Sequence, residues 1–348
     1  MRVVRVRRQD VDEALGRLLA ADVVERGLKV SRRGDHALIP VLVDPPASVL
    51  AGIEHQVGEV DVEDLAPRER LRTPLERVAR DAREAGWTDE EVEALPDRWE
   101  RLGRLVLLRV PRALEPKEEE MAGLYARVLR VDAVLAEEGP VTGIERRPTV
   151  RPIWGEGTVT VHREHGVEYE FDAARQMFSK GNVGERLRMG RTVRDGEVVV
   201  DMFAGIGYFS LPMAVMGSPA AVHAVEIDEE AHRWLERNVT RNGVEDVVRP
   251  RLGDCRDVAP RGVADRVVMG YVGGTEEFLD VAMEVLGTGG GVVHLHEKYG
   301  IEEVPDRPLE AVRGAAGAAG REARLLSWRE VKSYAPAIVH AVVDVDVQ

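Results

Sequence analysis

The second half of the sequence alternates short apolar runs with amphipathic segments of helical period, and this rhythm constrains the fold more than any other feature. Apolar runs that predict strands cover residues 198–203, 221–227, 247–252, 266–271 and 291–296. Segments that predict helices between them cover residues 209–215, 229–242 and 276–286. A helix between consecutive strands is a crossover connection, which makes neighbouring strands parallel. The rhythm therefore predicts a doubly wound α/β sheet.

The last two apolar runs depart from this rhythm. Residues 322–331 and 337–345 are joined by Lys332-Ser333-Tyr334-Ala335-Pro336. This connection is too short for a crossover helix, so we expect the two strands to pair antiparallel at the edge of the sheet. The predicted sheet is thus parallel except for an antiparallel terminal strand pair.

The first part of the chain predicts smaller α+β regions. Apolar residues at helical spacing begin at Val11, and a strand over residues 36–43 ends at Asp44-Pro45-Pro46. The later expectations are a helix-like charged stretch at 73–93, a strand at 105–110, a helix at 117–129 and a hairpin of residues 158–161 and 167–171. The boundary with the alternating part falls within residues 180–195.

A glycine-rich turn follows the first strand of the alternating part. The segment Asp201-Met202-Phe203-Ala204-Gly205-Ile206-Gly207 joins a buried strand to a helix. Glycines in such a turn let a ligand approach the backbone without meeting a Cβ atom, near the N-terminus of a helix. We therefore predict that Asp201, Phe203, Gly205 and Gly207 contact a cofactor.

Carboxylates end the next two predicted strands. Glu226 lies nineteen residues after Gly207, close to the spacing of roughly 20 at which an acid accepts hydrogen bonds from ribose hydroxyls. Asp254 and Cys255 close the third strand, where we expect Asp254 to accept from an adenine amino group and Cys255 to pack against the ring. The alternatives are a capping or solvent-facing Glu226 and a helix N-cap at Asp254.

Two residues distinguish between the cofactors that use such a crevice. A dinucleotide site needs a third glycine or an alanine beneath the pyrophosphate, whereas this chain has Ser210 there. Asp201 would repel a pyrophosphate but can receive an ammonium group, directly or through water. The sequence therefore favours S-adenosylmethionine over NAD.

Three segments make the chain resemble a known superfamily: Met177-Phe178-Ser179-Lys180-Gly181-Asn182, residues 201–208 and residues 264–272. Over residues 99–347 the chain resembles class I methyltransferases, and within them the group of tRNA guanine-N1 methyltransferases and wybutosine-pathway aminocarboxypropyltransferases. The resemblance implies a class I methyltransferase-type doubly wound sheet. We accordingly expect a small α/β unit at 1–60, a substrate-handling α+β region at 61–190 and an S-adenosylmethionine-binding catalytic domain at 191–348.

The resemblance also implies roles for individual residues. Ser179 and Arg186 fall where the cofactor is contacted, and Arg186 can grip its carboxylate, with a loop role or a tRNA phosphate contact as alternatives. Gly270 and Tyr271 fall where the acceptor base arrives, and Tyr271 can stack on the base or simply pack at the strand end.

The same strand end separates the two branches of this group. The N1-methyltransferase type carries an Asn-x-Pro motif there, whereas this chain has Met269-Gly270-Tyr271-Val272. The resemblance therefore implies transfer of the 3-amino-3-carboxypropyl group to a wyosine-type guanosine next to the anticodon of tRNAPhe, with release of methylthioadenosine. No catalytic base is assigned. Two other functions stay open, namely tRNA guanine-N1 methylation and a non-catalytic RNA-binding protein on the same fold.

Composition limits the possible partners. A net charge of −14 means that tRNA contact requires a local basic patch. One candidate patch, which ordinary solvated arginines would equally explain, consists of Arg186, Arg188, Arg191 and Arg194.

The chain carries no pattern typical of a metal site or a membrane segment. Cys255 is the single cysteine, and His294 and His296 have no third ligand nearby in sequence, so we expect no metal. No apolar run approaches the roughly 20 residues of a bilayer span. We therefore expect a cytoplasmic protein with no membrane partner, and the oligomeric state stays open.

Overall fold

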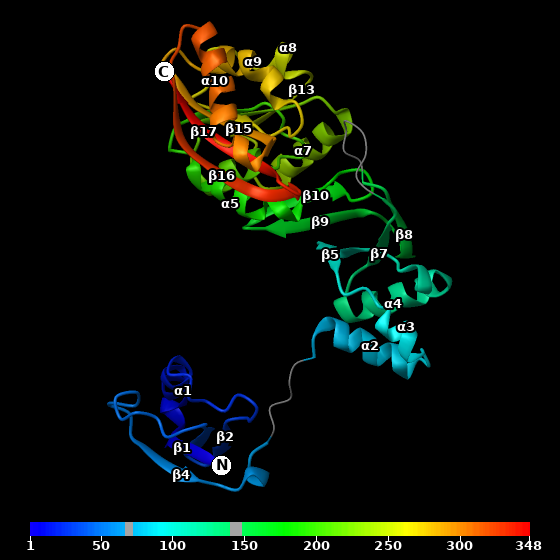
Figure 1. Cartoon of the computed structure of the whole chain (residues 1–348), viewed down its shortest axis with the longest axis vertical. Helices are drawn as coiled ribbons and strands as arrows, with labels where there is room; N and C mark the ends of the chain where they lie inside the picture. The colour runs from blue at the N-terminus through cyan, green and yellow to red at the C-terminus, as the bar shows by residue number, and fades with distance from the viewer. Residues whose placement is uncertain (67–71, 140–147) are drawn as a thin grey trace. The chain divides into compact units, whose positions relative to one another are not determined.

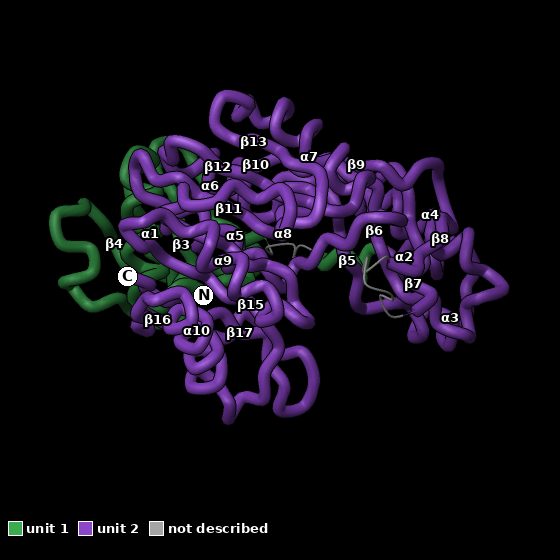
Figure 2. Tube along the Cα trace, turned by 90° about the horizontal axis from the view of Figure 1, so that it is seen from above, with its two compact units in different colours: residues 1–77 green, residues 78–348 purple. Residues whose placement is uncertain are grey.

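The structure is a computed structural model that describes residues 1–66, 72–139 and 148–348. It forms two compact units, Met1–Arg77 and Val78–Gln348 (Figure 2). The expected three-part division at residues 60 and 190 stays a prediction.

The first unit packs a helix against one face of an antiparallel sheet. Its elements over residues 1–66 are β1 (Arg2–Arg7), η1 (Arg8–Asp10), α1 (Val11–Ala20), β2 (Ser31–Arg33), β3 (His36–Pro40), β4 (His55–Glu59) and η2 (Val62–Asp64). The strand order is β2-β3-β1-β4. Val4 and Val6 of β1 share a core with Val11, Ala14 and Leu18 of α1, because alternate strand residues meet one stripe of the helix. The expected helix and strand in this part are confirmed.

The second unit begins with helices and a mixed sheet. Its first elements are α2 (Pro74–Glu84), whose first four residues belong to the first unit, α3 (Asp89–Glu93), β5 (Trp99–Leu102), β6 (Leu105–Leu108), η3 (Arg112–Lys117), α4 (Glu118–Leu129), β7 (Ala133–Glu137) and β8 (Val150–Gly155). The sheet order is β5-β6-β7-β8. The prediction of one continuous helix over residues 73–93 was wrong. Gly86 adopts a φ of 85° after α2, and Thr88 starts the separate helix α3 with a capping box to Glu91.

A hairpin of β9 (Val159–Glu164) and β10 (Val167–Asp172) follows, as expected. Its two turn residues, His165 and Gly166, have φ angles of 51° and 85°, which suits a two-residue hairpin turn. Helix α7 (Glu229–Arg241) covers the outer edge of β10. The Asn238 side chain accepts from the Glu170 amide at 2.7 Å and donates to its carbonyl at 3.1 Å. A buried asparagine thus satisfies strand backbone that has no further strand beside it.

The largest sheet carries the alternating part of the chain. Its elements, with the helices around it, are η4 (Lys180–Asn182), α5 (Val183–Thr192), β11 (Val198–Asp201), α6 (Ser210–Met216), β12 (Ala221–Glu226), α7, β13 (Val248–Leu252), α8 (Cys255–Val258), β14 (Arg266–Met269), η5 (Thr275–Phe278), α9 (Leu279–Val285), β15 (Gly291–Gly300), η6 (Ile301–Glu303), α10 (Asp306–Ala318), β16 (Ala323–Ala335) and β17 (Ile338–Val347). Within residues 148–348 the strand order is β13-β12-β11-β14-β15-β17-β16.

The predicted topology of this sheet is confirmed. Strands β11 to β15 are parallel, and β17 pairs antiparallel with both β15 and β16. The structure also contains helices α5 and α10, which were not predicted from the sequence. The inner face of α10 carries alanine beside Leu309 and Val312, so its apolar stripe is weak.

Helices cover both faces of this sheet (Figure 1). Side chains from α5, α6 and α7 and the β9–β10 hairpin pack on one face, and those from α8, α9 and α10 pack on the other. Consecutive residues of β11 divide accordingly, with Val199 in the first core and Val200 in the second. This alternation is the pleat of a strand buried on both sides.

A buried polar layer lies between α5 and the terminal strands. Asp344 of β17 accepts hydrogen bonds from Arg188 at 2.7 Å and from Ser327 at 2.7 Å, and it is also paired with His294. Burial alone would raise the pKa of Asp344, but His294 and Arg188 outweigh it and hold the pKa well below its usual range. Arg188 and His294 therefore serve the fold, and Arg188 does not belong to a solvated basic patch.

Replacing Asp344 by alanine should leave its buried partners without their charged acceptor. We expect Asp344→Ala to lower the free energy of unfolding by about 3 kcal/mol, because Arg188 and His294 would lose a charged acceptor. Asp346→Ala is the control, since Asp346 faces the exposed Arg324 at 3.6 Å and should cost less than about 1 kcal/mol. Urea titrations of the two variants measure this difference, and equal losses would contradict it.

Candidate cofactor site

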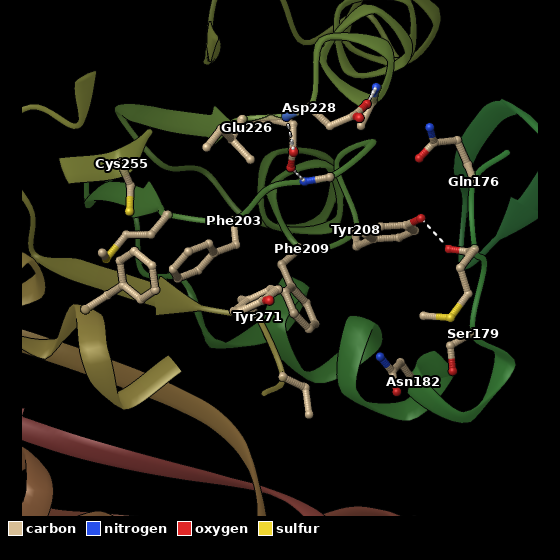
Figure 3. A pocket seen from close by; sticks show the side chains of 18 of the residues that line it. Gln176, Ser179, Asn182, Phe203, Tyr208, Phe209, Glu226, Asp228, Cys255 and Tyr271 are labelled. Carbon is tan, nitrogen blue, oxygen red and sulfur yellow. Dashed lines mark hydrogen bonds between the residues drawn. The ribbon is translucent and has the colours of Figure 1, made fainter. Parts of the chain in front are cut away.

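A cavity of about 360 Å³ opens over the carboxyl ends of β11, β12 and β14 (Figure 3). This volume is in the range of small-molecule sites. The predicted site residues that line it are Ser179, Arg186, Phe203, Gly205, Glu226, Asp254, Cys255, Gly270 and Tyr271. Asp201 and Gly207 were also predicted to contact a cofactor, and they do not line the cavity.

The glycine turn owes its shape to two positive φ angles. Gly205 has a φ of 57° and Gly207 a φ of 101°. A Cβ at Gly205 would lie 2.5 Å from the Tyr208 ring, and one at Gly207 would lie 2.6 Å from Leu211. Gly207 is therefore required for packing against α6. Of these two glycines, only Gly205 lines the cavity.

Asp201 lies beneath the turn, fully buried. Its carboxylate accepts from the Phe203 amide at 3.3 Å and from Ser210 Oγ at 2.7 Å. Burial raises the pKa of Asp201 to about 6. The expected direct contact with an ammonium group is thus replaced by a bracing role, which also explains why Ser210 stands in place of a third glycine.

Glu226 ties the end of β12 to the glycine turn. One carboxylate oxygen accepts from the Gly205 amide at 2.7 Å and the other from the Asp228 amide at 2.8 Å (Figure 3). Burial raises the pKa of this carboxyl group. Glu226 is not the helix cap, because Asp228 caps α7 through Ala231. A carboxylate has about four lone-pair sites, so Glu226 can accept further hydrogen bonds from ribose hydroxyls.

Asp254 and Cys255 both line the cavity, and Cys255 lies at the opposite end from Ser179 (Figure 3). Asp254 is the N-cap of α8, accepting from the Arg256 amide at 2.9 Å, and its side chain also pairs with the Arg256 guanidinium. The alternative of an N-cap is therefore what the fold uses, and an adenine contact by Asp254 stays a prediction. Burial raises the pKa of Cys255 to about 11, which suits packing and not reaction.

Aromatic side chains form the wall near the end of β14. The Phe203 ring lies 5.5 Å from Tyr271 and 5.0 Å from Phe278 between centroids. A Cβ at Gly270 would meet the Phe209 ring at 2.9 Å, so glycine lets Phe209 reach the cavity. Tyr271 packs on Phe203 and also lines the cavity, which keeps both of its predicted roles open.

Arg186 is buried in an ion pair that the sequence did not reveal. Its Nε and Nη2 atoms both donate to Glu164, and its guanidinium carbon lies 4.5 Å from the centroid of the Phe178 ring. With a side chain 2% exposed, Arg186 is shielded from a tRNA phosphate. The bidentate grip on a cofactor carboxylate stays a prediction: Arg186 lines the cavity, and two of its five donors bind Glu164.

Several lining residues were missed by sequence reasoning. Lys332, Tyr334 and His340 come from the terminal strand pair, and Lys332 Nζ donates to Ser179 Oγ at 2.7 Å. The Tyr208 hydroxyl donates a hydrogen bond to the Met177 carbonyl (Figure 3). No linear motif links residues 153 positions apart, so only the pairing of β16 with β17 brings Lys332 here.

The residues of the cavity fit S-adenosylmethionine. Glu226 offers acceptors for a ribose, and Cys255 and Phe278 offer apolar surface for an adenine. The side-chain oxygen of Asn182 is buried without a hydrogen-bond partner among the described residues. An orphaned polar group in a cavity wall indicates a polar ligand.

The part of the chain that the structure describes holds neither a cluster of metal ligands nor a helix fit to span a membrane. Across residues 1–66, 72–139 and 148–348, no three histidine, cysteine or acidic side chains gather as metal ligands would. None of the helices in those ranges combines the length and apolar character needed to cross a bilayer.

The burial of Asp201 predicts a pH-dependent stability. Because its pKa rises from 3.8 to about 6 on folding, the group stabilises the folded state at acidic pH and loses this contribution as the pH rises through about 6. We expect the unfolding free energy of the wild type, relative to Asp201→Asn, to fall between about pH 4 and about pH 7 in denaturant titrations. Hydrogen bonding to Arg256 lowers the pKa of Asp254, so the control Asp254→Asn should show no trend over this range. Parallel profiles for wild type and Asp201→Asn would refute the assignment.

Two family models match the chain in succession. The TYW2 N-terminal domain matches residues 79–158, and the TRM5/TYW2 methyltransferase domain matches residues 160–324. A tRNA(Phe) (4-demethylwyosine(37)-C(7)) aminocarboxypropyltransferase of Pyrococcus horikoshii is 39% identical over 259 residues, which are 74% of this chain and 92% of that protein. The tRNA (guanine(37)-N(1))-methyltransferase Trm5b of Pyrococcus abyssi is 30% identical over 331 residues, which are 94% of this chain and 93% of that protein.

Solved structures agree with these matches. P. horikoshii TYW2 in complex with MeSAdo has a TM-score of 0.70 at 36% identity, covering 77% of this chain and 97% of that one. M. jannaschii TYW2 in complex with AdoMet has a TM-score of 0.60 at 34% identity, covering 72% of this chain and 99% of that one. The expected class I methyltransferase-type fold is confirmed. The chain belongs to the TYW2 family of transferases.

Proposed function

We propose that the protein transfers the 3-amino-3-carboxypropyl group of S-adenosylmethionine to C7 of 4-demethylwyosine at position 37 of tRNAPhe, releasing methylthioadenosine. The P. horikoshii and M. jannaschii relatives are named for this reaction. The same proposal includes binding of the protein to the anticodon region of the tRNA.

The observation that carries the proposal is the end of β14. Gly270 and Tyr271 stand where the N1-methyltransferase type has an Asn-x-Pro motif. Gly270 lets the Phe209 ring approach, so the acceptor would meet aromatic surface from Phe203, Phe209 and Tyr271. Such a wall suits a flat tricyclic base held by stacking.

In this reaction the main task of the protein is to position the cofactor and the acceptor base. S-adenosylmethionine supplies an electrophilic γ-carbon and a neutral thioether as leaving group. The acceptor carbon bonds to the γ-carbon as the carbon–sulfur bond breaks, and it then gives up its proton to solvent. Glu226 and the glycine turn would fix the nucleoside, while the aromatic wall would hold the acceptor base in line with the carbon–sulfur bond. Holding two reactants in this way can supply much of a rate enhancement.

Labelled cofactor distinguishes the two transfer reactions. We expect tRNA that carries 4-demethylwyosine to acquire label from the carboxypropyl position and none from the methyl position, with labelled methylthioadenosine formed from the adenosyl part. Unmodified tRNA is the control and should acquire neither label. Entry of methyl label would replace the proposal with the runner-up, tRNA guanine-N1 methylation.

Glu226 distinguishes an enzyme from an RNA-binding scaffold. We expect Glu226→Ala to weaken S-adenosylmethionine binding by about 10- to 100-fold, because two charged hydrogen bonds to the ribose would be lost. Glu229→Ala is the matched control and should bind normally, because Glu229 is exposed on the following helix, pairs with Arg233 and does not line the cavity. Calorimetric titration measures both variants, and unaffected binding in Glu226→Ala would favour the non-catalytic reading.

A further inference from the structure

The stretch of chain that follows β14 carries two residues of the aromatic wall. Tyr271 lies at its start and Phe278 at its end, and both line the cavity and pack against the Phe203 ring. Between them, Gly273 and Gly274 have φ angles of 118° and 109°. Only glycine adopts such angles without strain, and two glycines in succession leave the backbone many conformations. The position of Tyr271 therefore depends on what holds the chain just beyond it.

A buried carboxylate on the neighbouring strand holds the chain at this point. One oxygen of Glu297, on β15, accepts hydrogen bonds from the Gly274 amide at 2.5 Å and the Thr275 amide at 2.8 Å. The other oxygen accepts from the Lys298 amide at 2.7 Å. The residue is 7% exposed. Hydrogen bonds from amides to a charged carboxylate are stronger than those between neutral groups, so this contact fixes the end of the glycine pair.

The Glu297 carboxylate takes the place of a helix cap. Gly274 occupies the N-cap position of η5 and has no side chain with which to cap it. Glu297 accepts the first amides of η5 from a different strand instead. Two residues further along β15, the Tyr299 hydroxyl donates to Glu276 of η5 at 2.8 Å. Residues two apart on a strand point to the same face, so β15 holds η5 at two points.

This arrangement is costly for the fold. Across the described parts of the chain, the hydrogen-bond partners of the Glu297 carboxylate are these three backbone amides, and no cation pairs with it. Burying a carboxylate without a cation costs free energy. Local features that cost stability are expected at functional sites, and this one lies directly behind the wall where the acceptor base would stack.

We propose that Glu297 is a positioning residue that holds Tyr271 at a fixed place in the aromatic wall and so aligns the acceptor base with the cofactor. The inference rests on the proposed function, since it requires a base stacked on Tyr271. Glu297 does not line the cavity, so it acts through the amides of Gly274 and Thr275. A displacement of about 1 Å in such an aligned pair of reactants can lower the rate about 100-fold.

The first test is the isosteric change Glu297→Gln. The amide oxygen can still accept from Gly274 and Thr275, but without the charge, and the new NH₂ group would face the Lys298 amide as donor to donor. We expect single-turnover transfer of the carboxypropyl group, at saturating S-adenosylmethionine and tRNA, to slow about 10- to 100-fold. The calorimetric Kd for S-adenosylmethionine should change less than about threefold, because Glu226 still holds the nucleoside.

Two more variants complete this comparison. Glu302→Gln is the matched control, since Glu302 is exposed in η6 and does not line the cavity, and it should transfer at the wild-type rate. Gly274→Ala keeps the backbone amide but makes the φ of 109° strained, so it disturbs the same turn without touching the carboxylate. It should show the same slow transfer with normal cofactor binding.

A double-mutant cycle separates positioning from a loss of stability. If Glu297 acts through Tyr271, then Glu297→Gln in a Tyr271→Ala background should slow transfer less than about twofold further. A merely structural role would slow transfer by the same factor in both backgrounds, and that result would overturn the inference. Wild-type rates in both Glu297→Gln and Gly274→Ala would overturn it as well. A wild-type protein that transfers no carboxypropyl group would instead overturn the proposed function.

Discussion

The hydrogen bond from the Gly205 amide to Glu226 is the contact on which the site depends. It joins the glycine turn to the end of β12, at 2.7 Å, and so fixes the mouth of the cavity between two parallel strands. Asp201 supports the same turn from beneath through Phe203 and Ser210. Two carboxyl groups are buried for this purpose, and burial raises the pKa of each. Burying these carboxyl groups costs free energy, and their hydrogen bonds hold the backbone of the glycine turn in one conformation.

Charge is compensated locally throughout the catalytic part of the chain. Arg186 binds Glu164, and Arg188 binds Glu185 and Asp344, so two of the four arginines in the segment before β11 are neutralised internally. These pairs hold α5 against the hairpin and the terminal strands. They remove Arg186 and Arg188 from the candidate basic patch, whereas Arg191 and Arg194 are exposed. Among the basic residues that line the cavity, Lys332 is supplied by the terminal strand pair and donates to Ser179.

The architecture was predictable because its determinants are local in sequence. Runs of apolar residues and the short link before β17 predicted the strands and their directions, whereas the strand order came only from the structure. Helix α10 was not predicted because its inner face is largely alanine. Site residues within one motif were found as a group, but the motif alone could not say which of them face the ligand. Gly205 and Gly207 look alike in sequence, but Gly205 lines the cavity whereas Gly207 packs against Leu211. Lys332 could not be found, since its position follows from its register opposite His340.

The choice of transferred group is a question of geometry. All three carbons on a sulfonium are electrophilic, so the reacting carbon is the one that lies in line between the acceptor and the departing sulfur. In this cavity the acceptor wall begins at Gly270, where the absence of a side chain admits the Phe209 ring. A methyl-transferring relative needs polar acceptors at that point to hold a ring nitrogen, while a carbon nucleophile needs only stacking and alignment. A glycine at the end of β14 therefore opens space at this wall, and the aromatic rings beside it offer a flat surface on which a base can stack.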